Sequence, residues 1–324
     1  MLPLNYNFLM GHKVHNIVDC FPYFNEKELL ELRINLLKDY VDKFVIVDAN
    51  YTHSGNKKEY TLKKTISELK LPSEKIEVIE VDLSEECLPD CDFYDEHFLN
   101  TSQKTSRERF QRDVISKCLD TNNFSEETIF IISDCDEIIN PKYIDTYKKA
   151  CYDNPQFIFK ADLVYLEGKC NCRLYCSDSP DIPAEWRYSL FFCNKNQLKN
   201  MSLSAIRGGV YDYLIRWVYS GDDRIKDVGW HFSWMGSNQN RILKSKSFCH
   251  YNQEIDTLKY SNYSNVEMEN FLLEYNFSEG EICPSGNIGM IIKQYPLENL
   301  PQIIFDLPRV KQFLLPQLAY NGTN

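Results

Sequence analysis

Three carboxylates follow a short apolar run near the middle of the chain and offer its clearest chemistry. Residues 128–141 read TIFIISDCDEIINP, and Asp134, Asp136 and Glu137 come directly after the apolar part. Carboxylates this close together repel one another, so the pattern favours a bound cation. Their oxygen atoms suit a hard ion such as Mg²⁺ or Mn²⁺, which also binds the phosphates of a substrate. The alternative interpretation is an acidic turn whose carboxylates cap a helix.

The apolar run itself predicts where these carboxylates lie. Residues 129–132 are Ile-Phe-Ile-Ile, a sequence that suits a strand buried on both faces of a parallel sheet. Strand alternation would place Asp134 and Asp136 on the same side. Ligands of open α/β sheets bind beyond the carboxyl ends of the strands. The sequence therefore predicts a metal and phosphate site at this end of the strand, with Asp136 as the first-choice ligand.

Strand–helix units precede the motif and would position it. We expect strands at residues 15–20, 43–48 and 74–82, and a helix after the first strand, opened by an Asn25–Glu28 capping pattern. The apolar inner face of this helix would consist of Leu29, Leu30, Ile34 and Leu37. Such units favour an α/β fold with a mostly parallel sheet and helices on both faces. We predict that its strands end at Asp19, Asp48, Asp82 and Ser133.

The second half of the chain has a different character. Residues 157–166 and 186–193 suit antiparallel strands, and the Cys-rich loop between them, with Cys170, Cys172 and Cys176, is expected to be a flap. Further helices are expected at residues 106–119, 240–250 and 266–275.

Composition limits the class of protein. The chain has 324 residues, 43% of them hydrophobic, which is enough for a sizeable core. Its net charge of −11 argues against non-specific nucleic-acid binding. No apolar run is long enough for a membrane span, and the first residues do not resemble a secretory signal. Several of the 12 cysteines lie in apolar strand-like runs, which favours reduced thiols and a cytoplasmic location. The Golgi lumen is the alternative if an anchor was removed from the chain.

Several motifs, taken in order, resemble glycosyltransferase family 17, whose mammalian members add the bisecting N-acetylglucosamine to N-glycans. The similarity runs from about residue 15 to residue 316. The residues that carry it are Asp19-Cys20-Phe21 with Asn25-Glu26, the stretch 29–55, the set Arg107, Glu108, Gln111 and Arg112, SDCDEI at 133–138, GWHFSW at 229–234 and KSKSFCHYNQE at 244–254.

The resemblance implies a GT-A-type nucleotide-sugar-binding fold. We expect one domain over residues 1–324, with a nucleotide-binding half at about 15–150 and an acceptor-side half at about 151–316. It also implies inverting transfer of a sugar, usually N-acetylglucosamine, from a UDP-sugar donor to a glycan or glycoprotein acceptor. A divalent ion, Mn²⁺ or Mg²⁺, would stabilise the leaving diphosphate.

Three alternatives differ from this prediction. The first is another donor, UDP-xylose or UDP-galactose, and the second is a non-catalytic carbohydrate-binding protein that kept the fold. A nucleotidyl- or phosphotransferase is disfavoured because the sequence contains no G-x-x-x-x-G-K-S/T or G-x-G-x-x-G loop.

Candidate metal ligands follow from the acidic motif and the resemblance together. Asp136 would bind the ion directly, Asp134 would bind it through water or hold the ribose, and Glu137 would orient a neighbour. His231 lies in an apolar run, where a lone histidine is more often a core residue. The resemblance favours a metal or diphosphate ligand instead, because GT-A enzymes commonly use a late histidine in this way.

Other side chains are candidates for donor binding or for base catalysis. Asp48 and Asn50 would meet the nucleobase or ribose, and Arg107 or Arg112 would reach the nucleotide. Trp230 or Trp234 would stack on a sugar ring, and Lys244 and Lys246 would pair with the diphosphate; plain packing and a solvated helix face are the alternatives. Inversion requires a general base, for which the carboxylates of the second half are candidates. These are Glu185, Asp222, Asp223 and Asp227.

Overall fold

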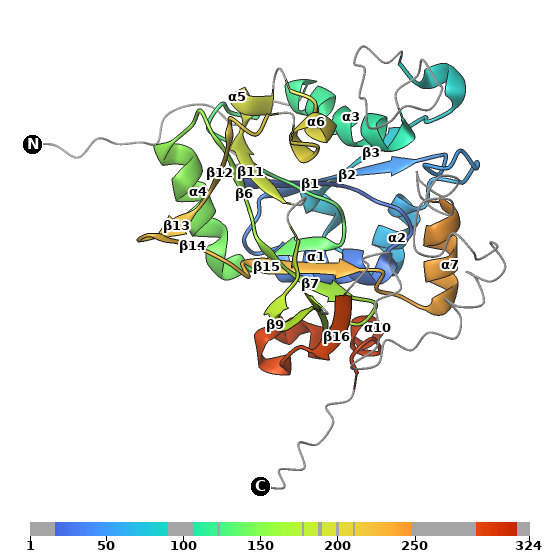
Figure 1. Cartoon of the computed structure of the whole chain (residues 1–324). Helices are drawn as coiled ribbons and strands as arrows, with labels where there is room; N and C mark the ends of the chain where they lie inside the picture. Colours follow the sequence, from blue (N-terminus) through green and yellow to red (C-terminus); the bar gives the residue numbers. More distant parts are fainter. Residues whose placement is uncertain are drawn as a thin grey trace, which may run out of the picture.

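The protein contains two large β-sheets that lie next to each other (Figure 1). The acidic motif joins a strand of one sheet to a strand of the other. The structure is a computed structural model that describes residues 17–89, 106–121, 124–176, 178–186, 190–198, 201–209, 211–247 and 290–315. One sheet has the strand order β12-β6-β11-β4-β1-β2-β3, and the other has β16-β8-β7-β15-β5 as its main path.

The first sheet is mixed but mostly parallel, as predicted. Its strands are β1 (Ile17–Pro22), β2 (Lys43–Ala49), β3 (Ile76–Val81), β4 (Ile129–Ile132), β6 (Ile158–Lys160), β11 (Phe191–Asn194) and β12 (Ile215–Trp217). The neighbours β4–β1, β1–β2, β2–β3 and β6–β12 are parallel, whereas β11 runs antiparallel to both β4 and β6. All four residues of β4 are buried, because this strand lies between β1 and β11 with a packed layer on each face. The α/β class and the buried central strand are confirmed.

Three of the four predicted strand ends are correct to within a residue. Strand β2 ends at Ala49, β3 at Val81 and β4 at Ile132. The prediction for Asp19 was wrong, because β1 continues to Pro22. Asp19 is buried in mid-strand, where Arg33 neutralises its charge.

Helices cover both faces of the first sheet. The first helices are α1 (Lys27–Leu37), α2 (Leu62–Glu68), α3 (Arg107–Thr121) and α4 (Ile144–Asp153). Helix α3 packs on β1 and β2 together with the short α6 (Leu203–Arg207), while α4 packs on β6 and β11. The predicted inner face of α1 is confirmed, since Leu29, Leu30, Ile34 and Leu37 are buried. The predicted capping box was wrong: the residue before the helix is Glu26, and its carboxylate accepts a hydrogen bond from the Phe24 amide instead.

The second sheet contains β5 (Glu137–Ile139), β7 (Leu163–Glu167), β8 (Cys172–Cys176), β15 (Gly229–Ser233) and β16 (Met290–Gln294). Strand β9 (Ser179–Pro183) pairs with β8, and β10 (Glu185–Trp186) pairs with β7. The predicted antiparallel pairing of 157–166 with 186–193 is therefore present, but it is divided between the sheets as β6–β11 and β7–β10. The predicted Cys-rich flap was wrong, because β8 is a sheet strand and Cys170 and Cys172 are buried.

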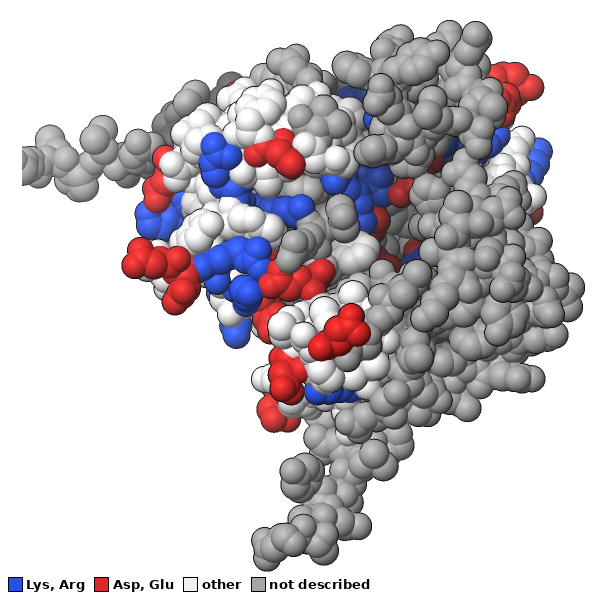
Figure 2. Space-filling model, in the orientation of Figure 1, with Lys and Arg blue, Asp and Glu red and all other residues white. Residues whose placement is uncertain are grey.

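The remaining elements are α5 (Lys195–Leu198), β13 (Tyr219–Ser220), β14 (Asp223–Arg224), α7 (Asn238–Ser247) and α10 (Pro308–Lys311). Helix α7 corresponds to the helix predicted at 240–250, whereas the one predicted at 266–275 lies outside the described residues. Among the described helices, none combines the length and apolar character that a membrane crossing requires. The face drawn in Figure 2 shows basic side chains interspersed with acidic ones.

Candidate active site

The acidic motif forms the turn that carries the chain from one sheet to the other. Strand β4 ends at Ile132 in the first sheet, and β5 begins at Glu137 in the second. Asp134 and Asp136 therefore lie in a turn and not on a continuing strand. Their predicted placement on the same side was wrong, because strand alternation stops at Ile132 and each carboxylate contacts a different set of cations.

Asp134 lies against two arginines from different helices. Arg112 Nη2 is 3.0 Å from Asp134 Oδ1, and Arg207 Nη2 is 2.8 Å from Oδ2. Burial opposes ionisation of Asp134, but these two guanidinium groups outweigh it and lower the pKa of the carboxyl. Asp134 is therefore a fixed anion that arginines of α3 and α6 already neutralise.

Glu137 is fully buried and has a complete set of partners. Arg207 forms a bidentate pair with it, at 3.0 Å from Nη1 to Oε2 and 2.9 Å from Nη2 to Oε1. Trp186 Nε1 donates to Oε1 at 2.7 Å, and the Asp134 amide donates to Oε2 at 2.9 Å. Because every donor is in place, Glu137 braces the turn and holds the Trp186 indole.

Arg33 of α1 supports the turn from inside the core. Its side chain is fully buried, and it pairs with Asp19 through Nε at 2.8 Å and Nη2 at 2.5 Å. Its Nη1 donates to the backbone carbonyls of Asp134 at 2.7 Å and Glu137 at 2.9 Å. Its Nη2 also donates to Ser133 Oγ at 2.7 Å. One guanidinium group thus fixes the backbone of the turn.

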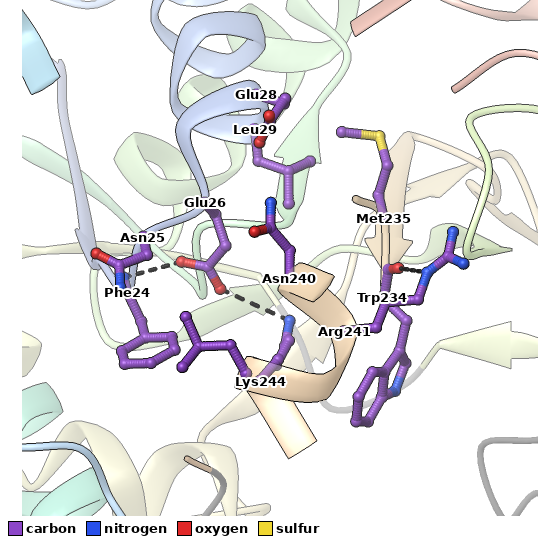
Figure 3. A pocket seen from close by; sticks show the side chains of 11 residues that line it. Phe24, Asn25, Glu26, Glu28, Leu29, Trp234, Met235, Asn240, Arg241 and Lys244 are labelled. Atoms are coloured by element: carbon purple, nitrogen blue, oxygen red, sulfur yellow. Dashed lines mark hydrogen bonds and ion pairs between the residues drawn. The ribbon is translucent and has the colours of Figure 1, made fainter. Parts of the chain in front are cut away.

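Asp136 points away from the arginines and toward α7. Lys244 Nζ lies 3.0 Å from Asp136 Oδ2 and 3.6 Å from Glu26 Oε1 (Figure 3 shows Lys244 and Glu26). Burial opposes ionisation of Asp136, but Lys244 and, after it, His231 outweigh this effect and lower the pKa of Asp136. Burial also opposes the charge on Lys244, but Asp136 and Glu26 together raise its pKa. The ammonium group is therefore shared by two carboxylates.

His231 lies on β15, opposite Glu137 of β5, and faces Asp136. Its ring is buried and stacks on Trp186 with a centroid distance of 4.0 Å. The distance from His231 Nε2 to Asp136 Oδ1 is 3.7 Å, which is beyond hydrogen-bond reach. Within the described residues, Nδ1 has no hydrogen-bond partner. Burial of Nδ1 without a partner costs free energy, and Nε2 is the ring nitrogen that faces Asp136.

The geometry fits a metal ion between Asp136 and His231. Ligand atoms of Asp136, Glu137 and His231 lie within 4.8 Å of one another, so the group could hold an ion. The Glu137 carboxylate already accepts hydrogen bonds from Trp186 and Arg207. Asp136 Oδ1 and His231 Nε2 are therefore the two atoms of this group that could bind the ion. Adjacent ligands of an octahedral ion lie about 3 Å apart, so a small movement would close the pair on an ion. Asp134, predicted as a ligand, faces the arginines instead.

Part of the chain that forms the candidate site matches a known protein family. Residues 6–167 match the model of Glycosyltransferase family 17. The chain belongs to glycosyltransferase family 17. It is therefore an enzyme that transfers sugars, and the acidic turn lies inside the matched region. No curated protein matches the chain.

Three solved structures are similar to this family 17 chain at low scores. 4-Diphosphocytidyl-2C-methyl-D-erythritol synthase has a TM-score of 0.36 at 9% identity, over 65% of this chain and 93% of that one. The mannosyltransferase PcManGT from Pyrobaculum calidifontis, with GDP-Man and Mn²⁺, has 0.37 at 10%, over 80% and 68%. GalNAc-T7 with UDP, GalNAc and Mn²⁺ has 0.33 at 10%, over 56% and 35%.

The predicted donor-binding residues near β2 have structural partners in this family 17 chain. Asp48 is buried and accepts from the Thr61 and Leu62 amides at 2.7 and 2.8 Å, at the start of α2. Asn50 Oδ1 accepts from the Leu83 amide at 3.0 Å. Arg107 Nε donates to the Leu83 carbonyl at 2.9 Å. These side chains shape the loops at the carboxyl ends of β2 and β3, and their contact with a donor stays a prediction.

The candidates for donor binding in the second half of the chain lie in different places, one in the core and others near a pocket. Trp230 is buried in the main core, as the packing alternative expected. Trp234 lines a pocket beside Lys244. Lys246 lies on the same helix, where its carbonyl accepts from Ser54 at 2.7 Å and joins α7 to the loop after β2.

The predicted base candidates lie outside the cluster around Asp136. Glu185 pairs with Lys226 at 2.8 Å and Arg224 at 3.0 Å. The hydrogen bond from Lys226, with help from Arg224, lowers the pKa of Glu185 to about 2, which makes it a weak base. Asp227 forms a bidentate pair with Arg173 at 3.0 and 2.8 Å. Asp222 and Asp223 are exposed at the β13–β14 turn.

Four residues of the site were not predicted in a site role from the sequence. Arg33 and Arg207 are single arginines on amphipathic helices, Trp186 was read only as part of a strand, and Glu26 only as part of a family motif. Their roles depend on contacts between distant segments, such as Arg207 with Glu137. No spacing rule in the sequence signals such contacts.

Proposed function

We propose that this enzyme transfers a sugar, N-acetylglucosamine as the first choice, from a UDP-sugar to a hydroxyl group of a glycan acceptor with inversion. The reaction would use Mn²⁺ or Mg²⁺. Membership of family 17 supports the reaction class. The single observation that carries the metal is the buried Asp136–His231 pair, with Oδ1 and Nε2 3.7 Å apart.

The charges around the turn suit a diphosphate leaving group. A bound divalent ion would supply Lewis-acid stabilisation of the negative charge that develops on the diphosphate. Asp136 and His231 would hold that ion. Lys244 keeps its positive charge beside Asp136 and would pair with a phosphate oxygen, while Arg112 and Arg207 hold Asp134 away from the ion. The preorganised cations would lower the cost of separating charge in the transition state.

Binding and turnover test the proposal together. Thermal unfolding of the full chain should be measured with UDP-N-acetylglucosamine, UDP-xylose and UDP-galactose, each with and without Mn²⁺. Ligand that binds the folded state raises the melting temperature by mass action. We expect the shift to be largest with UDP-N-acetylglucosamine and to require the metal, and we expect mass spectrometry to show one added sugar on an N-glycan acceptor.

Other outcomes separate the alternatives. A larger shift and product with UDP-xylose or UDP-galactose would replace the donor and keep the mechanism. A shift with free glycans but with no UDP-sugar, and no product, would identify a carbohydrate-binding protein and overturn the proposed activity.

A further inference from the structure

A pocket opens between the start of α1 and helix α7, directly beside the candidate metal ligands (Figure 3). About 420 Å³ of empty space, part of it open solvent, lies between its walls. Lys244 forms part of its wall, and the same ammonium group is 3.0 Å from Asp136 Oδ2. The pocket and the candidate metal site therefore share a wall.

The lining combines an aromatic ring with amides and a carboxylate. Trp234 contributes an indole, Asn25 and Asn240 contribute amides, and Glu26 contributes the carboxylate, with Leu29 as apolar surface. A sugar ring offers C–H faces to an aromatic side chain and hydroxyl groups to amides and carboxylates. An apolar wall with a few polar groups that fix orientation is the usual composition of a specific ligand site.

The backbone has a positive φ at two places in this lining. Asn25 and Trp234 have φ angles of 53° and 53°, and they are two of the four described non-glycine residues with positive φ. Such conformations are rare for L-residues and cluster at ligand-binding sites. Arg241 Nε donates to the Trp234 carbonyl at 2.9 Å and holds the strained residue in place. The fold thus keeps the bulky Trp234 in a backbone conformation that is rare for such a residue, whereas Asn25 is a residue type that tolerates it.

Glu26 is held at the boundary between the pocket and the acidic turn. Its Oε2 accepts from the Phe24 amide at 2.8 Å, which fixes the carboxylate. Its Oε1 lies 3.6 Å from Lys244 Nζ, too far for a hydrogen bond, and therefore retains capacity to accept a proton. One lysine separates this oxygen from Asp136.

The groups around Glu26 set its ionisation. Burial is the main cause that raises the pKa of Glu26, to about 7. Lys244 of α7 opposes this effect, whereas Asp136 and Asp134 of the turn add to it. Arg241 of α7 and Glu28 of α1 complete the charged groups that line the pocket. A general base works best when its pKa lies near the operating pH.

We propose that the pocket receives the acceptor sugar and that Glu26 is the general base of the transfer. This inference rests on the proposed function. The acceptor O–H bond breaks and its proton moves to the Glu26 carboxylate, while the acceptor oxygen forms a bond to the anomeric carbon of the donor. The bond from that carbon to the diphosphate oxygen breaks, and its electron pair leaves with the diphosphate. Glu26 touches the acceptor, whereas the earlier candidates Glu185 and Asp227 are engaged with basic partners.

The test compares Glu26→Gln, Glu26→Asp and wild type in the full chain, with UDP-N-acetylglucosamine, Mn²⁺ and an N-glycan acceptor. Glu26→Gln should lower kcat by roughly 100-fold or more, the usual contribution of a general base. UDP affinity in the presence of Mn²⁺ should stay within about twofold of wild type, since the donor does not need Glu26. Asp145→Asn is the matched control, because Asp145 is an exposed carboxylate in the first turn of α4, away from the pocket.

The pH profile is the readout that a merely structural role would not move. In wild type, kcat/KM should rise with pH through about 7, the pKa of Glu26 in this structure. Glu26→Gln should lose this rise. Glu26→Asp keeps a carboxylate, so it should be slow but retain the rise, and it provides the test if Glu26→Gln does not fold.

Two results would overturn the assignment of Glu26. One is wild-type kcat in Glu26→Gln, and the other is a loss of UDP affinity as large as the loss of turnover, which would mean that Glu26 acts only by placing Lys244. A wild-type protein that binds and transfers no UDP-sugar would instead overturn the proposed function. The wild-type donor measurement therefore distinguishes the two failures.

Discussion

Asp134 and Asp136 are two residues apart and have the same side chain, yet their surroundings differ in kind. Asp134 contacts two arginines, one of which also forms a bidentate pair with the fully buried Glu137. Asp136 contacts Lys244, which it shares with Glu26, and faces His231, whose Nδ1 has no hydrogen-bond partner among the described residues. Arginine forks fix geometry, whereas a lysine is a point charge on a flexible stem. We call Asp134 with Arg112 and Arg207 the arginine side, and Asp136 with Lys244 the lysine side. We infer that the arginine side braces the turn and that ligands exchange on the lysine side.

Breaking the arginine side should have the largest effect. Arg207→Met leaves Glu137 buried without its bidentate partner, which should lower the free energy of unfolding by about 3–5 kcal/mol. Lys244→Met, on the lysine side, should lower it by only about 1–2 kcal/mol, because 26% of the Lys244 side chain is exposed to solvent. Urea unfolding followed by fluorescence measures both. Equal losses in the two variants would contradict the division into a braced side and an exchangeable side.

Removing Asp136, the proposed metal ligand on the lysine side, should remove most of the transfer activity while the protein stays folded. Asp136→Ala should lower kcat by about 100- to 1,000-fold, because the developing charge on the diphosphate loses its stabilisation. Asp136→Asn should be nearly as damaging, since an amide is a neutral and weaker ligand. Steady-state assays with and without excess chelator check the prediction. Full activity of either variant, or of wild type in chelator, contradicts the metal assignment.

Substitution of His231 should change both donor affinity and stability, because the ring lies between Asp136 of the lysine side and Trp186, a partner of Glu137. The ring faces Asp136 and also stacks on Trp186, which Glu137 holds. His231→Gln should weaken UDP binding in Mn²⁺ about 10- to 100-fold, and His231→Ala should in addition lower the melting temperature because it leaves a cavity beside Trp186. Calorimetric titration and thermal unfolding separate the effects. Unchanged UDP affinity in His231→Gln would make His231 a core residue only.

Substitution of Glu185 should have the smallest effect on kcat, and it tests whether Glu185 or Glu26 is the general base. Its pKa is lowered to about 2 by Lys226 and Arg224, so it is a poor proton acceptor at neutral pH. Glu185→Gln should therefore change kcat by no more than about threefold, against the 100-fold or greater loss that removal of a general base causes. An assay at pH 7 against Glu26→Gln makes the comparison direct. A large loss in Glu185→Gln with a small one in Glu26→Gln would reverse the assignment.

The sequence was informative where local pattern determines structure. The run Ile129–Ile132 predicted the buried central strand, and the leucines of α1 predicted its inner face, because burial on each face imposes a composition. The Asp-x-Asp motif was located correctly at the end of that strand. The direction of its two carboxylates was not predictable, since Arg112 and Arg207, which orient Asp134, come from other elements.

The second half was harder to predict because one continuous segment, residues 158–167, contributes one strand to each of the two sheets. Residues 158–167 form β6 and β7 with a break at Ala161 and Asp162, and each strand pairs with a different partner. An apolar run shows that a segment is buried, but it does not show which sheet buries it. The Cys-rich segment was mistaken for a flap for the same reason, although β8 pairs with β16 along its whole length.

Arg33 makes the formation of the acidic turn a consequence of the folding of the chain's first segments. Its guanidinium group contacts the carbonyls of Asp134 and Glu137, 101 and 104 positions later in the sequence. Closing a loop of that size costs entropy that local contacts do not offset. The turn should therefore acquire its shape only when β1 and α1 have docked on β4, as one cooperative unit. Slowly exchanging amides in β1 and around the turn should then share a single opening free energy in native-state hydrogen exchange.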